Sequence, residues 1–508
     1  MSPSNSIAAL LEKGDDEGIA IGAPEGGAPL RSRDLRALAR RTVDQLNALG
    51  VGRGDRVAIV LPNGPEMAAA FLAVGAGAAT APLNPAYRAE ELEFYLGDLQ
   101  PRALIVAAGA DGPAGAVATR LGIPVIDLEP LPDRPAGTFQ LRLPTARPDG
   151  GGRMAGPDDV ALLLHTSGTT SRPKLVPLAQ RNVAASARHI GRALDLAAGD
   201  RCLNIMPLFH IHGLIGAVLS SLAAGGSVFC TPGFNALKFF AWLDEAVPTW
   251  YTAVPTMHQA ILARADRNRE IIGRRRLRLI RSSSASLPPA VMAELETVFG
   301  CPVIESYGMT EASHQMTSNP LPPRPRKPGT VGLAAGPEVA ILDEAGRRLP
   351  AGGIGEVGIR GPNVTAGYVS NPQANAAAFT DGWFRTGDQG VLDAEGYLTI
   401  TGRLKELINR GGEKISPREI DDLLSTHPAV AQVVTFAIPH DKLGEDVAAA
   451  VVLREGQSVS DRDLRDFVAG RLADFKVPRR IVFLDEIPKG ATGKLQRIGL
   501  AAKLGLSA

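Results

Sequence analysis

Apolar residues recur every three or four positions between residues 31 and 49, the spacing of a helix with one buried face. The positions are Leu35, Leu38, Ala39, Val43, Leu46 and Leu49. A short apolar run at 57–61 then predicts a buried strand, and Pro65 stands where the first residue of a following helix would lie. The chain thus opens with alternating helices and strands.

The same alternation continues through the next 250 or so residues. Further strands are expected at 103–106, 160–164, 202–206, 227–230, 250–254, 277–281 and 303–306, and helices at 236–246 and 288–299. Strands separated by helices form mostly parallel sheets whose faces the helices cover. Ligands of such folds bind at the carboxyl ends of the strands, and polar runs begin at three of these ends, near residues 166, 281 and 305.

From about residue 329 the pattern changes to short strands with glycine-rich turns, expected at 338–342, 355–360 and 397–401. A second change comes near residue 405, where a compact module of roughly a hundred residues begins. Its predicted strands are 433–437, 447–453 and 481–484, and its predicted helices are 417–425 and 464–473.

The fold class predicted from these patterns is α/β. A large N-terminal domain, residues 1–402, would combine parallel-rich sheets covered by helices with a small β-rich subdomain. A small, mobile α+β C-terminal domain, residues 403–508, would follow it through a connection at 402–406. A chain of 508 residues is long for a single core, which agrees with this division.

Composition narrows the class of protein. The chain is 45% hydrophobic and 21% charged, which is typical of a globular protein. A net charge of +1 argues against nucleic acid as the main partner. The three cysteines have no Cys-x-x-Cys spacing, which favours a reducing compartment and argues against a structural zinc site.

The sequence predicts neither a targeting signal nor a transmembrane segment. The N-terminus lacks the basic start and apolar core of a signal peptide, and the C-terminus is not the Ser-Lys-Leu peroxisomal signal. The apolar segment 206–230 contains His210 and His212, and its uninterrupted apolar runs are shorter than the ~20 residues that a bilayer requires. We expect a buried helix and a strand there, no transmembrane segment and a cytoplasmic protein.

The loop after the predicted strand 160–164 has the chemistry of a phosphate-binding site. Its hydroxyl residues, glycine and cations are Thr166, Ser167, Gly168, Thr169, Thr170, Ser171, Arg172 and Lys174. Hydroxyl and backbone N–H groups donate to phosphate oxygens, Gly168 allows close approach, and Lys174 adds positive charge. The second glycine and the Gly-Lys-Ser/Thr ending of a Walker loop are missing. A surface turn rich in Ser and Thr has the same composition, so the loop alone leaves nucleotide binding open.

Seven motifs together resemble those of the adenylate-forming superfamily, which includes acyl-CoA synthetases, luciferases and the adenylation domains of peptide synthetases. They stand in the family's order at 166–174, 207–210, 307–311, 386–388, 402–403, 411–414 and 493–494. One such motif would mean little. Seven in order over essentially the whole length identify the chain as a member of the superfamily.

The resemblance implies an enzyme that gives a carboxylate a leaving group. The carboxylate attacks the α-phosphorus of ATP, pyrophosphate leaves an acyl-adenylate behind, and a thiol displaces AMP. Both steps build negative charge, which fixed cations and N–H donors stabilise. Lys494 matches the family's catalytic lysine, Glu311 matches its Mg²⁺ ligand, and His210 joins the catalytic candidates. Taken singly, a lysine near a C-terminus is usually solvated, and a glutamate at a helix start is favoured by the helix dipole.

The resemblance also implies contacts around the adenosine. Asp388 matches the ribose-binding aspartate, and Arg403 matches an arginine near the ribose and phosphates, although Gly-Asp is also a common turn pair. The other nucleotide candidates are Ser284, Ala285, Glu305, Ser306, Tyr307 and Thr310.

The small domain of this family is expected to swing between the two steps. Lys405 lies at the family's hinge position, where an ordinary linker lysine would look the same. After the swing, Gly411, Gly412 and Glu413 would face the thiol. Nothing after Lys494 resembles a carrier domain, so free CoA is the expected acceptor and a separate carrier protein is the alternative.

The acid pocket is predicted to be polar. One wall of the pocket would be formed by the segment from Glu311 to His314. The opposite wall would carry Ser284, with His210 and His212 from another segment. Burying such groups beside an alkyl chain is costly, which favours a short acid with a second charge. The stretches 281–287, 310–314, 318–322 and 409–417 resemble the oxalate–CoA ligase branch. The resemblance implies His314, Ser284 and His210 as oxalate contacts, with His212 beside them; for each histidine a structural role is the alternative.

Other interpretations stay open. The acid could be malonate or a fatty acid, because the oxalate branch is largely eukaryotic and often peroxisomal whereas this composition looks bacterial. A kinase or phosphoryl-transfer ATPase would release ADP, but no Walker aspartate or kinase catalytic-loop motif supports it. A non-catalytic AMP-binding protein or a luciferase-like oxygenase would share the fold. Monomer and homodimer are both compatible with the sequence.

Overall fold

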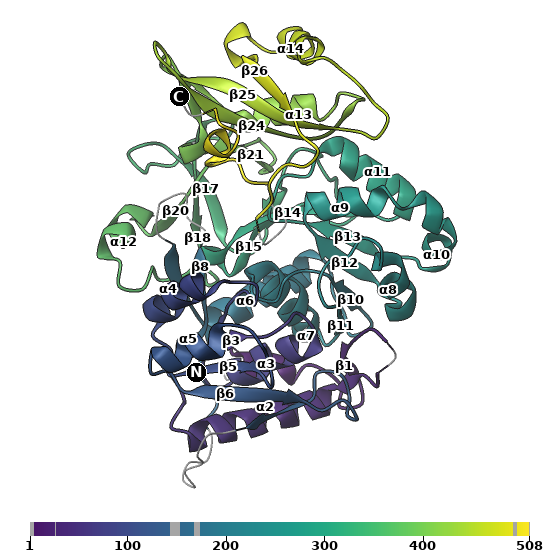
Figure 1. The fold of residues 1–508 in the computed structure, drawn as a ribbon, viewed down its shortest axis with the longest axis vertical. Helices are drawn as coiled ribbons and strands as arrows, with labels where there is room; N and C mark the ends of the chain where they lie inside the picture. The colour runs from purple at the N-terminus through teal and green to yellow at the C-terminus, as the bar shows by residue number, and fades with distance from the viewer. Residues whose placement is uncertain (1–4, 26, 143–152, 167–172, 491–494, 507–508) are drawn as a thin grey trace.

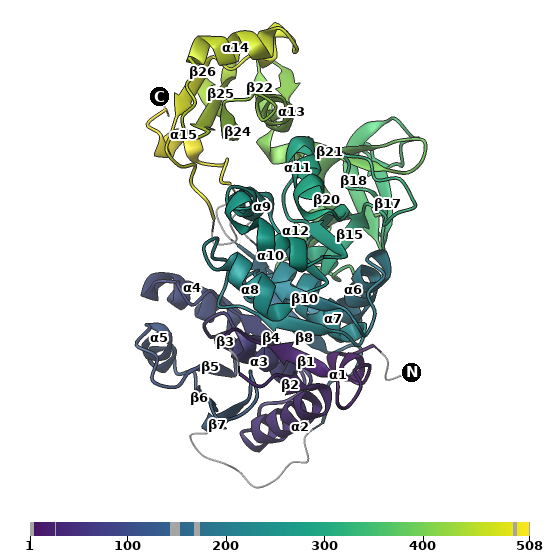
Figure 2. The ribbon, with the colours of Figure 1, turned by 90° about the vertical axis from the view of Figure 1, so that its right-hand side faces the viewer.

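Residues 5–25, 27–142, 153–166, 173–490 and 495–506 are described by the computed structural model (Figure 1). Their strands form a seven-stranded sheet, a nine-stranded sheet and two five-stranded sheets. Figures 1 and 2 both place the last of these sheets at one end of the molecule, away from the N-terminal strands. A large α/β N-terminal domain is therefore followed by a smaller C-terminal one, as predicted.

The seven-stranded sheet has five parallel strands between two antiparallel edge strands. Its strands are β3 (Arg56–Val60), β4 (Ala79–Pro82), β5 (Ala103–Ala107), β6 (Val125–Pro130), β7 (Phe139–Arg142), β8 (Val160–Thr166) and β9 (Lys174–Ala179). The central strands are apolar along most of their length because both faces of the sheet are covered. The long apolar runs in the sequence have this cause.

The nine-stranded sheet carries the polar strand ends of interest. Its strands are β1 (Ile19–Gly22), β2 (Leu30–Arg31), β10 (Arg201–Asn204), β11 (Ser227–Cys230), β12 (Trp250–Ala253), β13 (Leu279–Ser282), β14 (Val303–Met309), β15 (His314–Ser318) and β16 (Leu333–Ala334). Strands β10, β12, β13 and β14 are parallel neighbours, so their carboxyl ends lie at one edge. Strand β15 then returns antiparallel to β14.

Helix α3 (Pro65–Gly75) and the π-helix η1 (His212–Leu219) pack between the two large sheets. Helix α3 begins at Pro65, as predicted, and contacts β4 of one sheet and β1 and β11 of the other. Every residue of η1 is buried, which agrees with the helix expected within 206–230. The other helices of the body are α1 (Ile7–Leu11), α2 (Ser32–Ala48), α4 (Ala89–Leu99), α5 (Ala114–Arg120), α6 (Gln180–Ala193), α7 (Ser220–Ala223), α8 (Phe239–Ala246), α9 (Pro255–Leu262), α10 (Arg269–Arg274) and α11 (Pro289–Phe299).

The two smaller sheets complete the chain. The β-rich subdomain is antiparallel and contains β17 (Glu338–Leu342), β18 (Ile354–Arg360), β19 (Phe379–Thr380), β20 (Trp383–Leu392), β21 (Leu398–Arg403) and helix α12 (Pro372–Ala378). The C-terminal module contains β22 (Ile408–Arg410), β23 (Glu413–Ile415), α13 (Pro417–Leu424), β24 (Val430–His440), β25 (Gly444–Leu453), α14 (Asp461–Ala469), β26 (Arg480–Phe483) and α15 (Leu500–Lys503). Arg403 ends β21 and the 3₁₀ turn η4 (Leu404–Glu406) follows, so the boundary at 402/403 stays a prediction.

Each strand and helix predicted from the pattern has a counterpart whose ends differ by a few residues. The helix expected at 464–473 begins earlier, at Asp461, because Ser460 caps it: the Ser460 hydroxyl accepts from the Asp463 backbone N–H at 3.1 Å. Within the described ranges, no helix is both long and apolar enough to cross a bilayer.

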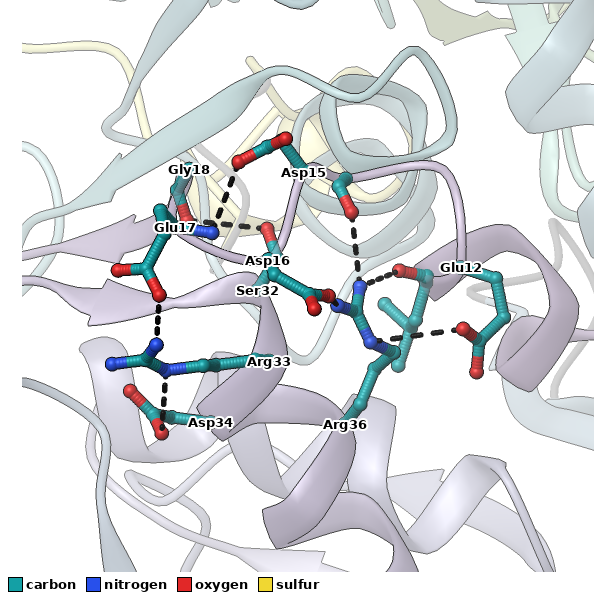
Figure 3. Close-up of polar contacts among 11 residues, drawn as sticks. Glu12, Asp15, Asp16, Glu17, Gly18, Ser32, Arg33, Asp34 and Arg36 are labelled. Atoms are coloured by element: carbon teal, nitrogen blue, oxygen red, sulfur yellow. Dashed lines mark hydrogen bonds and ion pairs between the residues drawn. The ribbon is translucent and has the colours of Figure 1, made fainter.

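An arginine on α2 links this helix to the segment from Leu11 to Asp16 (Figure 3). Arg36 donates to the carbonyl oxygens of Leu11 and Gly14 at 2.9 and 3.0 Å and pairs with the Asp16 carboxylate. Its side chain is 14% exposed, whereas that of Arg33, which pairs with Glu17, is 51% exposed. Arg36 therefore satisfies carbonyls that would otherwise face the protein surface without partners.

Replacing Arg36 with Met should lower the free energy of unfolding of the N-terminal domain by about 1–3 kcal/mol, because two carbonyls and a carboxylate lose a charged donor. The matched control is Arg33→Met, for which a change below about 0.5 kcal/mol is expected because its pair is exposed. Thermal unfolding followed by circular dichroism measures both. Equal effects of the two substitutions would contradict the role assigned to Arg36.

Candidate active site

One carboxylate joins three strands from two sheets. Asp388 of β20 is 5% exposed; its carboxylate accepts from the Tyr307 hydroxyl of β14 and, at 2.9 Å, from Nε of Arg403 in β21. Burial, then the neighbouring Asp388, raises the pKa of Tyr307 well above its usual range, so the hydroxyl keeps its proton. Three predicted nucleotide residues thus lie together.

An irregularity within β20, at residues 386–388, presents this carboxylate. Gly387 has a φ of +76°, a left-handed conformation that favours glycine. The Thr386 hydroxyl accepts from the Asp388 N–H at 3.1 Å, and the Gly387 N–H donates to Glu356 at 2.9 Å. The Gly-Asp pair therefore forms a β-bulge in the strand as well as a candidate ribose site.

Glu311 lies in the 3₁₀ turn η3 (Thr310–Ala312), directly after β14. The Tyr368 hydroxyl donates to its Oε1 at 3.0 Å, and Nζ of Lys174 lies 4.5 Å from the centre of the Tyr368 ring. Burial raises the pKa of Glu311, and Tyr368, Lys174 and Arg403 partly oppose that rise. A predicted metal ligand and a predicted phosphate ligand therefore share one tyrosine.

The donor chemistry at Glu311 suits magnesium. A hard cation takes one or two carboxylates and completes its shell with phosphate oxygens and waters. A pre-built cluster of three or more His, Cys, Asp or Glu ligands is absent from the described ranges. Glu311, with a nucleotide supplying the other oxygens, fits the predicted Mg²⁺ site.

The phosphate-binding loop is described only at its ends. Thr166 ends β8, Lys174 begins β9, and the two residues pair across the antiparallel ladder. The Thr166 hydroxyl donates to the Lys174 carbonyl at 3.4 Å. Ser167, Gly168, Thr169 and Thr170, as well as Lys494, lie outside the described residues, and their roles stay predictions.

Two histidines and a serine form the predicted acid wall. The His212 ring contacts the Ser284 hydroxyl at 3.0 Å and the Thr252 hydroxyl at 2.6 Å. The His314 ring packs edge to face on His212, with ring centres 4.9 Å apart. His210, in the turn before η1, accepts from the His212 backbone N–H through Nδ1 at 3.3 Å. All four predicted pocket residues thus belong to one cluster, and His212 is fully buried behind Ser284.

Two glycines make room for His314. A Cβ atom on Gly308 would lie 1.9 Å from the His314 carbonyl oxygen and 2.7 Å from its Nδ1. A Cβ atom on Gly216, in η1, would lie 2.6 Å from Nε2 of the same ring. His314 itself has a φ of +102°, an unfavourable value for a side-chain-bearing residue. The ring is therefore held in a fixed, closely packed position.

The remaining nucleotide candidates are spread over the β13 and β14 ends. Ala285 is exposed, and Thr310 and Ser284 are partly buried; Ser284 has a φ of +74°. The Ser306 hydroxyl donates to the Ser282 carbonyl at 3.3 Å. Glu305 is 1% exposed and accepts from the Leu287 N–H at 2.9 Å. The side chains of Glu305 and Ser306 thus stabilise the sheet, and their contact with a nucleotide stays a prediction.

The predicted CoA and hinge residues lie in the C-terminal module. Gly411, Gly412 and Glu413 are exposed at the turn between β22 and β23, and Lys405 is exposed in η4. Gly411 donates its N–H to the carbonyl of Leu443 at 2.9 Å. The described hydrogen bonds of this turn stay within the module, and its role toward CoA is untested.

A neighbouring arginine braces the hinge turn. Arg497 donates to Glu406 of η4 at 2.9 Å and to the Thr435 carbonyl at 2.7 Å, and it also pairs with Asp421. It therefore links the segment after residue 494 to the residue that follows Lys405.

Sequence reasoning missed three of the residues that support this site: Tyr368, Thr252 and Arg497. Each acts through a partner far away in the chain, as Tyr368 does toward Glu311, 57 positions earlier. Neither spacing nor local composition marks these residues. Arg281, at the end of β13, begins one of the polar runs noted in the sequence, which assigned it no role of its own.

Comparison with known proteins identifies the class. The family model of the AMP-binding enzyme matches residues 21–369, and that of the AMP-binding enzyme C-terminal domain matches residues 419–494. The chain belongs to the AMP-binding enzyme family.

The relatives of this chain include two proteins named as oxalate–CoA ligases. The chain is 45% identical over 506 residues to an oxalate–CoA ligase of Arabidopsis thaliana, covering 97% of this chain and 98% of that protein. It is 43% identical over 472 residues to an oxalate–CoA ligase of Saccharomyces cerevisiae, covering 88% and 86%. Among solved structures, ATP-bound MatB from Rhodopseudomonas palustris superposes with a TM-score of 0.89 at 33% identity, over 99% of both chains.

Burial raises the pKa of Glu305 from about 4.5 to about 7. Because the folded protein then holds this proton more tightly than the unfolded chain, Glu305 makes stability fall as the pH rises from about 4.5 to about 7. Glu305→Gln should remove this loss and raise the free energy of unfolding by about 2–3 kcal/mol at pH 8, with a much smaller gain at pH 5.

Thermal midpoints of the wild type and of Glu305→Gln across this pH range measure the difference. Glu294→Gln, on the exposed face of α11, is the control and should leave the curve unchanged. A gain for Glu305→Gln that is the same at pH 5 and pH 8 would show that charge burial is not its cause.

Proposed function

We propose that this protein is an ATP-dependent acid–CoA ligase and that its acid is oxalate. The observation that carries the proposal is the meeting of Glu311, Lys174 and the Asp388 cluster with the His314 wall around the carboxyl end of β14. Such strand ends are where α/β folds bind ligands. The names of the two ligase relatives support the same reaction and the same acid.

The first step joins two anions, the acid's carboxylate and ATP. The acid's carboxylate attacks the α-phosphorus of ATP, the bond to the β-phosphate oxygen breaks, and acyl-adenylate and pyrophosphate form. Lys174 and Arg403 place positive charge near the phosphates and ribose, and Lys494 bridges the carboxylate and the α-phosphate. Glu311 would hold Mg²⁺, which when bound neutralises phosphate charge.

The second step transfers the acyl group. The CoA thiol attacks the acyl carbon, AMP leaves, and the thiol proton is released to solvent. The small domain turns at Lys405 and brings Gly411, Gly412 and Glu413 to the thiol. A rotation of this kind lets one site serve both steps.

The choice of oxalate rests on the polar wall. Ser284 and His314 supply polar groups to this wall, with His212 buried behind Ser284, and burying such groups beside an alkyl chain is costly. A small acid with a second anionic group matches them. Malonate is the alternative small acid. We further place the enzyme in the cytoplasm, as a monomer or homodimer.

Purified protein with Mg-ATP, CoA and oxalate should release AMP and pyrophosphate and form oxalyl-CoA. Malonate, acetate, octanoate and benzoate, each tested alone, should give at least about 10-fold less product, because each lacks the size or the second charge that the pocket prefers. Liquid chromatography with mass spectrometry identifies the products. Turnover of octanoate or benzoate in place of oxalate would overturn the acid assignment, and release of ADP would overturn the ligase assignment.

Glu311→Gln should reduce the adenylation rate on the order of 100-fold and raise the Mg²⁺ concentration needed for half-maximal rate, because the metal exchanges an anionic carboxylate ligand for a neutral amide oxygen. Pyrophosphate exchange at graded Mg²⁺ concentrations measures both quantities. The control, Glu338→Gln, changes an exposed carboxylate that pairs with Arg360 and should alter neither. An unchanged Mg²⁺ dependence in Glu311→Gln would remove Glu311 from the metal site.

A further inference from the structure

A fully buried arginine lies behind the acid wall. Arg281 of β13 has no exposed surface and is one of the largest fully buried side chains. Its guanidinium contacts Nε2 of His314 at 3.4 Å and donates to Oε1 of Gln315 at 3.2 Å. Its Nε has no hydrogen-bond partner among the described residues.

No carboxylate of the described residues forms an ion pair with Arg281. The acidic group that interacts electrostatically with the guanidinium is the Cys202 thiol. Burial raises the pKa of that thiol, so the thiol is neutral and does not balance the charge. Arg278, three positions earlier, instead pairs with Asp200 at 2.9 Å. Burial lowers the pKa of Arg281 to about 9, which still leaves it charged at neutral pH. An uncompensated buried cation is costly.

The contact with His314 sets the state of that ring. A guanidinium can only donate, so Nε2 of His314 accepts and the ring proton lies on Nδ1. A second positive charge on the ring would be repelled by the guanidinium. Gly216 and Gly308 leave the space that the ring fills, because a side chain at either position would clash with it. The wall thus presents a neutral, oriented imidazole with a fixed cation behind it.

We infer that Arg281 is a positioning residue that gives the acid pocket its preference for a second negative charge. It acts through His314: it orients the ring and supplies the positive potential that a doubly charged acid meets. In a buried site this potential is weakly screened, so it separates dianions from monoanions of the same size. The inference rests on the proposed function, since it concerns the acid of that reaction.

The test compares oxalate with oxamate, which has nearly the same shape but one charge fewer. Arg281→Met should raise the KM for oxalate roughly 10- to 100-fold. It should change the inhibition constant of oxamate, measured against ATP–pyrophosphate exchange, less than about threefold because oxamate has a single charge. The KM for ATP should stay unchanged. Arg281→Lys, which keeps the charge, should recover most of the oxalate affinity.

Arg278→Met is the matched control, because its charge is already balanced by Asp200, and it should not change the ratio of the two constants. The thermal midpoint of every variant is measured, and if Arg281→Met does not fold, the comparison of Arg281→Gln with Arg281→Lys decides. An unchanged oxalate-to-oxamate ratio in the neutral variant overturns the inference, as does an equal change in Arg278→Met. Wild-type turnover of oxalate is the separate test of the proposed function.

Discussion

The Asp388 carboxylate is the interaction on which the geometry of the candidate site depends. It accepts from Tyr307 at the end of the nine-stranded sheet and from Arg403 at the end of the β-rich subdomain. The two sheets share one hydrophobic core, which contains Ile304 of β14 and Val357 of β18, and the carboxylate adds a polar link between them. Because charge-assisted hydrogen bonds are short and directional, they hold the orientation of the two sheets more tightly than apolar contact alone would.

Around this carboxylate, negatively and positively charged side chains lie close together, and they differ in how far they are exposed to water. Glu311 and Asp388 are buried carboxylates, and Lys174 and Arg403 are the cations that face them. Arg281 is fully buried, and no carboxylate of the part of the chain that the structure describes pairs with it. A site that binds two anionic substrates needs an excess of positive potential once they are in place, and buried cations supply it with little screening by water.

The sequence predicted the α/β architecture because parallel strands that are buried on both faces appear in the sequence as apolar runs, such as 57–61 and 250–254. It did not predict β15, whose residues from His314 to Ser318 are mostly polar and yet buried. Periodicity reads such a run as a loop, since only the three-dimensional partners satisfy its polar groups. For the same reason, the sequence predicted only some of the residues of the candidate site.

Motif order predicted Glu311, Asp388 and Arg403, and the structure brings all three together around the carboxyl end of β14. Tyr368 could not be predicted, because its bond to Glu311 depends on how two distant segments meet. Arg281 follows an apolar pair at the end of a strand, where a charged residue is usually solvated; its complete burial appears only once β14 and β15 cover it.

The hinge turn stands between two anchors. Arg403 is bonded to Asp388 on the side of the main body, and Glu406 is bonded to Arg497 on the side of the C-terminal module. Only residues 404 and 405 separate these anchors. If the module swings as proposed, the rotation would be concentrated in the backbone dihedral angles of Leu404 and Lys405, because the residues on either side of them are tied to different parts of the chain.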